Sequence, residues 1–521
     1  MSDPNPVADF FVPNEKEWNA EWAAAKNPLP HAEVREYERA AIIPLRWRKD
    51  GPNRNFEGGI VSETGEYLAG HLRALDDSNP PFTAKTSYDI PSDDIRERDE
   101  EVVFGGVLFD HIGHMITDSS ARLWYPVSTR DARKIVFLRS PEFKNWSSVD
   151  WKPLMELAGL DISRVEILEK PTRFRKVVVP QEAYYAHGGF RPEWTSFFDA
   201  VRSRVEPGGW KKVYLSRSKF ARGNVFNEDL FEQYYREQGF YVAYPEELDF
   251  RQKVALISGA DELVSTIGTT SHLFLFAKPG VRATVLLRTS SVLKMQLYIG
   301  AACSENCSYV ECFRNLLPSY HADGVYYLTP TPRFRSYLSS HSMPPFGTAR
   351  CDDAHASERV GAYVEKWLEV FGANPDVFDA SKSPMFRTMG GVAKLVRKLG
   401  PSDDRNRLAA GISVFVQSVL ERTAELEATR AELKATRAEL KATRAELKAT
   451  HAELKATRAE LKATRAELKA TRAGLKATRA KLKEAKIEMN RMWRRSFRGR
   501  IYSLLSLLRI VRLPAAPSGQ A

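Results

Sequence analysis

The chain is poor in cysteine and has no long apolar run. Four of its 521 residues are cysteines, which is too few for a disulfide scaffold and fits a reducing compartment. No stretch reaches the roughly 20 apolar residues that a membrane-spanning helix needs. A basic region followed by an apolar run is missing at the N-terminus, so we expect no signal peptide and predict a cytoplasmic location. A Gly-rich loop ending in Lys-Ser or Lys-Thr is also missing, which argues against a phosphoryl-transfer enzyme of the P-loop type.

The cysteine spacing does not indicate a metal site. Cys303, Cys307 and Cys312 lie close together in the sequence. They lack the Cys-x-x-Cys spacing that is typical of zinc ligands, so we interpret them as core thiols. We predict no metal in the functional site.

Strand and helix patterns alternate between Lys211 and Arg288. Short β-branched and aromatic runs predict strands, and amphipathic segments of about ten residues between them predict helices. This order is typical of βαβ units and a parallel sheet. A second alternating pattern covers residues 101–206 and ends at Pro207-Gly208-Gly209.

We therefore predict an α/β fold with two Rossmann-like lobes, a long helical coiled coil and a basic amphipathic tail helix. Residues 1–40 carry prolines, acids and two tryptophans, which we interpret as a loosely packed lead-in. The expected order is a lead-in with the start of the first lobe (1–100), an N-terminal lobe (101–206), a C-terminal lobe (207–345), a connector (346–421), the coil (422–487) and the tail (488–521).

Cations and a turn of small residues follow two predicted strands of the C-terminal lobe. Arg217 comes directly after the first strand, with Arg222 in the same loop, and Glu228 begins the next helix. The turn is formed by Gly268, Thr269, Thr270, Ser271 and His272. Ligands of parallel sheets bind beyond the carboxyl ends of the strands, and guanidinium groups with helix N–H groups suit a phosphate.

The N-terminal lobe contributes a histidine and an acid at helical spacing. The pattern predicts a helix over 112–124, where His114 and Asp118 share one face. The pair can act as a general base with its orienting carboxylate, or it can be a packed histidine with a hydrogen-bond partner. His111 is a weaker candidate, and we expect Arg122 to pair with Asp118.

Leucine recurs at every seventh residue from Leu426 to Leu482 in the repeat Thr-Arg-Ala-Glu-Leu-Lys-Ala. With Leu at position a, Thr occupies d, Arg e and Glu g. Each g glutamate then precedes an e arginine by five residues, as Glu432 does Arg437, which is the spacing of ion pairs in a parallel coiled coil. We predict a homo-oligomer through residues 422–487. A single solvated helix, spanning about 90 Å at 1.5 Å per residue, is the alternative.

The tail combines arginines with a short apolar run. Five arginines between Arg491 and Arg500 precede Ile501–Leu508, and Arg509 and Arg512 follow. This pattern suits a helix that lies in an anionic membrane interface over residues 488–513. Docking on the lobes or the coil is the alternative. No recognition motif accompanies the arginines, so we expect no nucleic-acid binding.

Two stretches resemble glycosyltransferase family 61 over roughly residues 100–290. The first carries Gly113-His114, Asp118 and Arg122-Leu123-Trp124. The second carries, in the family's order, Ser216-Arg217, Arg222, Asn227-Glu228, Gly239-Phe240, Pro245-Glu246, Ala260, Gly268-Thr269 and Leu275-Phe276. Many members have His before the turn glycine where this chain has Ile267, and His272 is the nearby substitute.

The resemblance implies a two-lobed GT-B fold and a hexosyl- or pentosyltransferase of bacterial capsule or exopolysaccharide synthesis. It implies an inverting, metal-independent transfer from a nucleotide sugar to a glycan or lipid-linked acceptor, without a further cofactor. His114 and Asp118 would be catalytic on the acceptor side. Arg217, Arg222, Glu228 and residues 268–272 would bind the donor. The coil and tail would hold the enzyme peripherally at the inner membrane. Because Ile267 departs from the pattern, a degenerate transferase fold that acts as a scaffold through its coil is the alternative.

Overall fold

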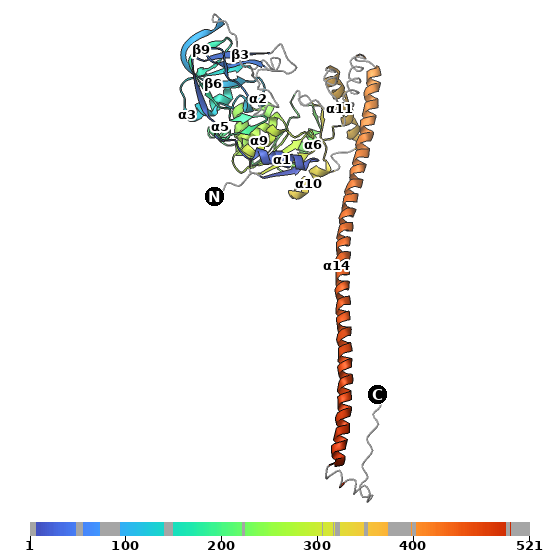
Figure 1. Ribbon diagram of the computed structural model, residues 1–521. Helices are drawn as coiled ribbons and strands as arrows, with labels where there is room; N and C mark the ends of the chain where they lie inside the picture. Colours follow the sequence, from blue (N-terminus) through green and yellow to red (C-terminus); the bar gives the residue numbers. More distant parts are fainter. Residues whose placement is uncertain are drawn as a thin grey trace. The chain divides into compact units, whose positions relative to one another are not determined.

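The computed structural model describes the α/β part of the chain and its C-terminal helix (Figure 1). The described residues are 7–47, 56–72, 94–139, 150–220, 224–304, 306–315, 317, 324–347, 353–373, 398, 403–495 and 501. Residues up to Thr423 form one compact unit, and residues from Ala424 form a second.

The C-terminal lobe is built on a six-stranded parallel sheet. Its strands in spatial order are β1 (Val7–Phe11), β17 (Asn306–Glu311), β16 (Arg282–Leu287), β15 (Glu262–Thr266), β12 (Lys212–Leu215) and β14 (Tyr241–Ala243). Every neighbouring pair of these strands runs parallel. The βαβ prediction for residues 211–288 is therefore confirmed.

Helices connect these strands and cover the sheet. They are α6 (Glu228–Glu237), α7 (Phe250–Gly259), α8 (Thr269–His272), η4 (Leu273–Phe276), α9 (Lys294–Cys303) and α10 (Pro332–Ser340). Asp249 begins α7 with a full capping box, because its side chain accepts from Gln252 N while Gln252 binds Asp249 N. The sequence pattern predicts helices from Asn227-Glu228 to about Gln238 and from Phe250 to Ser258, and α6 and α7 match these bounds within one residue.

The N-terminal lobe has an eight-stranded mixed sheet. Its strands are β2 (Val34–Glu38), β3 (Ala41–Trp47), β4 (Phe56–Val61), β5 (Tyr67–Ala69), β6 (Arg96–Leu108), β7 (Lys134–Arg139), β8 (Val165–Ile167) and β9 (Thr172–Pro180). Strands β9, β6, β7 and β8 are parallel, whereas β2, β3, β4 and β5 pair antiparallel. The Rossmann-like description thus fits only the parallel half of this sheet.

The remaining elements are short, apart from the helices described below. They are α2 (Ile112–Thr117), α3 (Trp124–Thr129), α4 (Lys152–Leu157), η2 (Ile162–Arg164), β10 (Tyr184–Tyr185), β11 (Gly189–Phe190), α5 (Pro192–Arg202), β13 (Val225–Phe226), η3 (Pro245–Glu247) and β18 (Tyr326–Tyr327).

The prediction of one helix over 112–124 is wrong, because α2 ends at Thr117 and α3 begins at Trp124. The Ser120 hydroxyl donates to Ile116 O at 2.6 Å. Side-chain bonds of this kind compete with the backbone bonds of a helix.

The N-terminal segment is part of the core. Strand β1 pairs with β17, and α1 (Glu15–Ala25) buries Trp18 completely and Trp22 to 94%. The ring of Phe10 stacks on Tyr309 with centroids 5.4 Å apart. The expectation of a loosely packed lead-in is therefore wrong for residues 7–25. In this segment, buried apolar side chains are interspersed with mostly exposed charged side chains.

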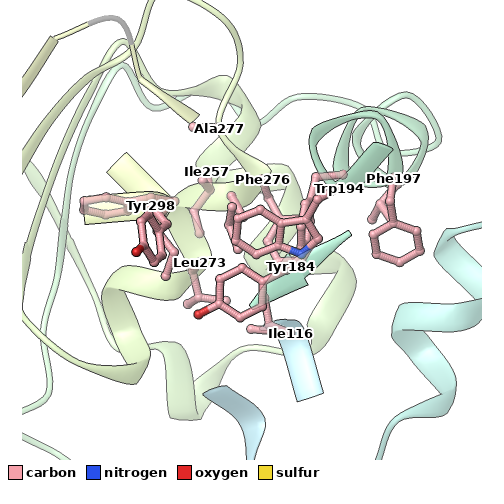
Figure 2. Close-up of a cluster of buried hydrophobic side chains, with 14 of the residues drawn as sticks. Ile116, Tyr184, Trp194, Phe197, Ile257, Leu273, Phe276, Ala277 and Tyr298 are labelled. Carbon is pink, nitrogen blue, oxygen red and sulfur yellow. The ribbon is translucent and has the colours of Figure 1, made fainter. Parts of the chain in front are cut away.

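Buried aromatic side chains join the two lobes. Figure 2 shows Tyr184 and Trp194 beside Phe276 and Leu273, with Ile116 of α2 at the edge of the cluster. The rings of Tyr184 and Trp194 stack at 4.3 Å. This packing fixes α2 against α8 and η4, which positions the site described next.

From Asp353 to Arg495, the described residues of the connector and the coil are helical. Helix α11 (Asp353–Ala373) packs Tyr363 and Trp367 against Ala409 and Val416 of α14 (Asp403–Arg495). Helix α14 is continuous over 93 residues. Most of the predicted tail helix lies outside the described residues. Among the described helices, none is long and apolar enough to cross a membrane.

Candidate active site

Three neighbouring strands of the C-terminal lobe end beside one another. Arg217 lies two residues after the end of β12, Gly268 lies two residues after the end of β15, and Arg288 comes directly after β16. Because β12, β15 and β16 are adjacent and parallel, these three positions lie at the same edge of the sheet.

The turn after β15 is built around Gly268. Its φ of +132° is accessible mainly to glycine, and a Cβ there would lie 2.7 Å from Arg288 Nη2. The Ser271 hydroxyl accepts from Gly268 N at 3.1 Å and lies 2.6 Å from Gln296 Oε1. Ser271 therefore holds the turn together, while Thr270 Oγ1 accepts from Arg217 Nη1 at 3.1 Å.

Arg217 and Glu228 are both buried in this region. Glu228 Oε1 accepts from Arg217 N at 3.2 Å and from the Tyr214 hydroxyl at 3.3 Å. Burial raises the pKa of Glu228 to about 7, although the two nearby arginines oppose this shift. Burial and the neighbouring Arg288 lower the pKa of Arg217 to about 10. The site thus concentrates positive charge that one weakly acidic carboxyl only partly compensates.

A histidine and an aspartate from α2 form a hydrogen-bonded pair. His114 Nδ1 lies 2.9 Å from Asp118 Oδ2, and the Thr117 hydroxyl donates to the same oxygen at 2.9 Å. With Asp118 ionised, the Nδ1 proton is held by the carboxylate, and the lone pair stays on Nε2. The predicted placement on one helical face is therefore confirmed, although the catalytic role stays a prediction.

Gly113 brings the two lobes into contact. A Cβ at this position would meet His272 Nδ1 and Thr269 Oγ1 at 3.1 Å each and His111 Cε1 at 3.2 Å. Helix α2 thus approaches α8 so closely that His111 and His272 both lie beside Gly113, and the ring centroid of His114 is 5.2 Å from that of His111. Burial and the neighbouring His114 lower the pKa of His111 to about 3 and that of His272 to about 4, so both are neutral at pH 7.

The family comparison covers this arrangement. A family model described as Glycosyltransferase 61 matches residues 112–286, from the start of α2 into β16. Residues 112–286 are therefore similar to the family 61 glycosyltransferase domain. No curated protein matches the chain.

Asp118 of the His114–Asp118 pair is also part of a buried series of basic and acidic side chains that alternate. His71 Nε2 lies 3.5 Å from Asp118 Oδ1, and His71 Nδ1 lies 3.2 Å from Glu182 Oε1. Arg122 Nη2 pairs with the same Glu182 oxygen at 3.1 Å. The expected pairing of Arg122 with Asp118 is wrong, because Arg122 turns to Glu182 and to the carbonyl of Gly70 at 2.6 Å.

His71, Glu182 and Arg288 were missed by sequence reasoning. His71 and Glu182 stand far from α2 along the chain, and no spacing connects them with it. Arg288 did carry a signal, because it directly follows a predicted buried strand, as Arg217 nearly does. It lies two residues beyond the part that matches the family.

The remaining sequence predictions concern Arg222 as a donor ligand and the cysteines as core thiols. Arg222 lies outside the described residues. Cys307 and Cys312 are buried in the core and Cys303 is partly buried against it, and burial raises the pKa of each thiol. Among the residues that the structure describes, no group of histidine, cysteine or acidic side chains is arranged to hold a metal ion.

Proposed function

We propose that the chain transfers a sugar from a nucleotide-sugar donor to a glycan or lipid-linked acceptor in bacterial surface polysaccharide synthesis. The observation that carries the proposal is the close approach of α2, next to which Asp118 accepts from His114, to the arginine-lined turn of the other lobe at Gly113. A base and a cationic leaving-group site at one point are what glycosyl transfer needs.

The proposed reaction is a single inverting displacement. His114 Nε2 accepts the proton of the acceptor hydroxyl, whose oxygen attacks the anomeric carbon of the donor. The bond from that carbon to the phosphate oxygen breaks, and the diphosphate leaves with the electron pair. Asp118 fixes the tautomer and stabilises the imidazolium that forms.

Protein groups would neutralise the leaving diphosphate in this account. Arg217 donates from its guanidinium, and Thr269 and Thr270 offer hydroxyl and backbone donors at the turn. His272 is neutral and buried next to Gly113, so it can orient an uncharged part of the donor. The donor is a substrate, and we propose a metal-independent reaction in a GT-B type pair of lobes.

The repeat of α14 supports a homo-oligomer. Its leucines are 50–69% exposed in the single chain. Each repeat threonine from Thr436 to Thr471 donates to the carbonyl four residues earlier at 2.9–3.0 Å. With its hydroxyl satisfied, threonine at position d presents its methyl group to a partner helix without an unpaired polar group. We propose a parallel coil that holds the enzyme, with its basic tail, peripherally at the cytoplasmic face of an anionic membrane.

Calorimetry on the full chain tests the transferase proposal. We expect one of UDP, GDP, CDP, CMP and TDP to bind, and Arg217→Ala to weaken that binding about 10- to 100-fold, the range for a lost charged hydrogen bond or two. Arg282→Ala is the control, because Arg282 lies at the opposite end of the sheet and pairs with Glu262 at 2.5 Å. Binding of none of these nucleotides by the folded chain would contradict the proposal. It would favour the scaffold alternative, to which the departure at Ile267 points.

A further inference from the structure

Two arginines flank the glycine turn from opposite sides. The strand order places β15 between β16 and β12, so the turn at Gly268 lies between Arg288 and Arg217. A Cβ built on Gly268 would be 2.7 Å from Arg288 Nη2 and 3.9 Å from Arg217 Nη1. Both guanidinium groups therefore reach the same small space beside the turn.

Arg288 has no carboxylate partner among the described residues. Its guanidinium carbon lies 4.4 Å from the centroid of the Tyr326 ring, and its buried Nε makes no hydrogen bond within the described part of the chain. Arg217 Nε is likewise buried and unbonded there. Taking cations out of water without full pairing is unfavourable, so such positions are typical of sites that receive an anion.

Glu228 is the acidic group that faces this pair. Its Oε1 is bonded to Tyr214 and to Arg217 N, whereas its buried Oε2 has no partner among the described residues. Other titratable groups interact electrostatically with these three side chains, namely Glu232, Glu246, Tyr214, Cys312, Tyr326, His111 and His272. Glu232 already accepts hydrogen bonds from the Ser216 hydroxyl at 2.6 Å and from the Tyr244 hydroxyl at 2.8 Å. Glu246 is exposed.

We propose that Arg288 is a second arginine ligand of the donor diphosphate, opposite Arg217, and that Glu228 is the counter-ion with which the diphosphate competes. The inference rests on the proposed function for the identity of the ligand. Two guanidinium groups on either side of one turn fit the two linked phosphates of a diphosphate better than a single phosphate. Without ligand, Glu228 partly balances the arginines, and with ligand it is favoured in its protonated form.

The test measures the binding of inorganic pyrophosphate and of nucleoside diphosphates to the full chain by calorimetry. Arg288→Ala is compared with Arg282→Ala, which removes an arginine from the other end of the same strand. We expect Arg288→Ala to lower the affinity for pyrophosphate about 10- to 100-fold, Arg288→Lys to lower it less, and Arg282→Ala to leave it within about twofold. Circular dichroism and thermal unfolding confirm that each variant is folded.

Glu228→Gln tests the competing counter-ion. Above pH 7 the wild-type carboxyl is increasingly ionised and opposes an anion. The glutamine variant should therefore bind pyrophosphate more tightly than wild type at pH 8 and similarly at pH 6. Because the ligand's own charge changes with pH in both proteins, only the difference between them reports on Glu228. Equal affinities at pH 8 would overturn this part of the inference.

The outcomes separate this inference from the proposed function. Nucleotide binding that survives Arg288→Ala unchanged would overturn the role of Arg288 and leave the transferase proposal standing. Pyrophosphate binding that depends on Arg288, with nucleoside diphosphates bound no more tightly than pyrophosphate, would support the two-arginine site. That second result would contradict the nucleotide-sugar proposal instead.

Discussion

His71 joins two buried carboxylates behind the proposed base. Burial alone would lower the pKa of His71, but its interactions with Asp118 and Glu182 raise it above the ordinary value. A protonated His71 would favour the ionised form of Asp118, and an ionised Asp118 would hold the Nδ1 proton of His114. The orientation of the base thus depends on a residue that stands before the first α/β unit of the sequence.

We expect His71→Gln to destabilise the protein by about 3 kcal/mol at pH 6, since it removes one charge from a buried, paired group. The contribution of a group with a raised pKa is present below its unfolded pKa and is lost as the pH rises through the folded pKa. The stability difference from wild type should therefore shrink from pH 6 to pH 9. Denaturant unfolding at both pH values measures it.

The control is His31→Gln, because the His31 side chain is 82% exposed and pairs with Glu193 at 2.7 Å. Its effect should stay below about 1 kcal/mol, as for surface ion pairs. A His71 effect that is equally small, or that grows with pH, would show that the buried histidine is not held charged.

At the residue scale, sequence patterns predict contacts between residues that are close in the sequence, but not between residues that are far apart in it. The i, i+4 rule places His114 and Asp118 on one face, and the structure joins them. No rule of spacing connects His71 or Glu182 with α2, because sheet pairing brings them there. Arg122 illustrates the limit, since a local partner was available and a distant carboxylate with carbonyl groups held it more completely.

At the scale of elements, the turn after β15 depends on glycine for two separate reasons. A side chain at Gly268 would have to adopt φ +132° and would collide with Arg288 Nη2 at 2.7 Å. Arg288 would have to move away from the turn. This element therefore couples the backbone of one strand end to the position of the cation on the next.

Gly268→Ala should lower the free energy of unfolding by about 1–3 kcal/mol through backbone strain and should also weaken pyrophosphate binding. Gly239→Ala is the matched control, because Gly239 has φ +81° and a Cβ there would meet no atom within 4 Å. It should cost stability alone. Equal binding by both alanine variants would contradict the coupling of the turn to Arg288.

Strands and helices with a clear period could be predicted, and those set by competing side chains could not. The elements of residues 211–288 follow alternating apolar runs and were found nearly to the residue. The break between α2 and α3 depends on where Ser120 bonds, which hydrophobic periodicity does not encode. Strand β1 was missed because its partner in the sheet, β17, is far from it in the sequence.

At the scale of the whole molecule, the leucines of α14 are the largest set of exposed apolar side chains in the described residues. A helix with one leucine per heptad has a narrow apolar face, and the proposed pairing of Glu432 with Arg437 of a second copy would add register. The seam would bring two transferase domains into one assembly.

We expect Leu454→Lys to convert an oligomer to monomer, because it places a cation at position a in every copy. Ala459→Lys adds the same charge at the outward position f and should leave the assembly intact. Sedimentation equilibrium distinguishes the two. A monomeric wild-type chain at micromolar concentration, or equal behaviour of both variants, would contradict the coil and favour the single solvated helix.

The central claim is that His114 is the base of a sugar transfer whose leaving group is held by the turn of the other lobe. The measurement that tests it is release of nucleoside diphosphate from the sugar of the nucleotide that binds, with oligosaccharide acceptors present, in wild type, His114→Ala and His31→Ala. The account predicts that His114→Ala binds the nucleotide as wild type does and releases it about 10²- to 10⁴-fold more slowly, the usual contribution of a general base. His31→Ala should match wild type. Release by His114→Ala at the wild-type rate would contradict the account.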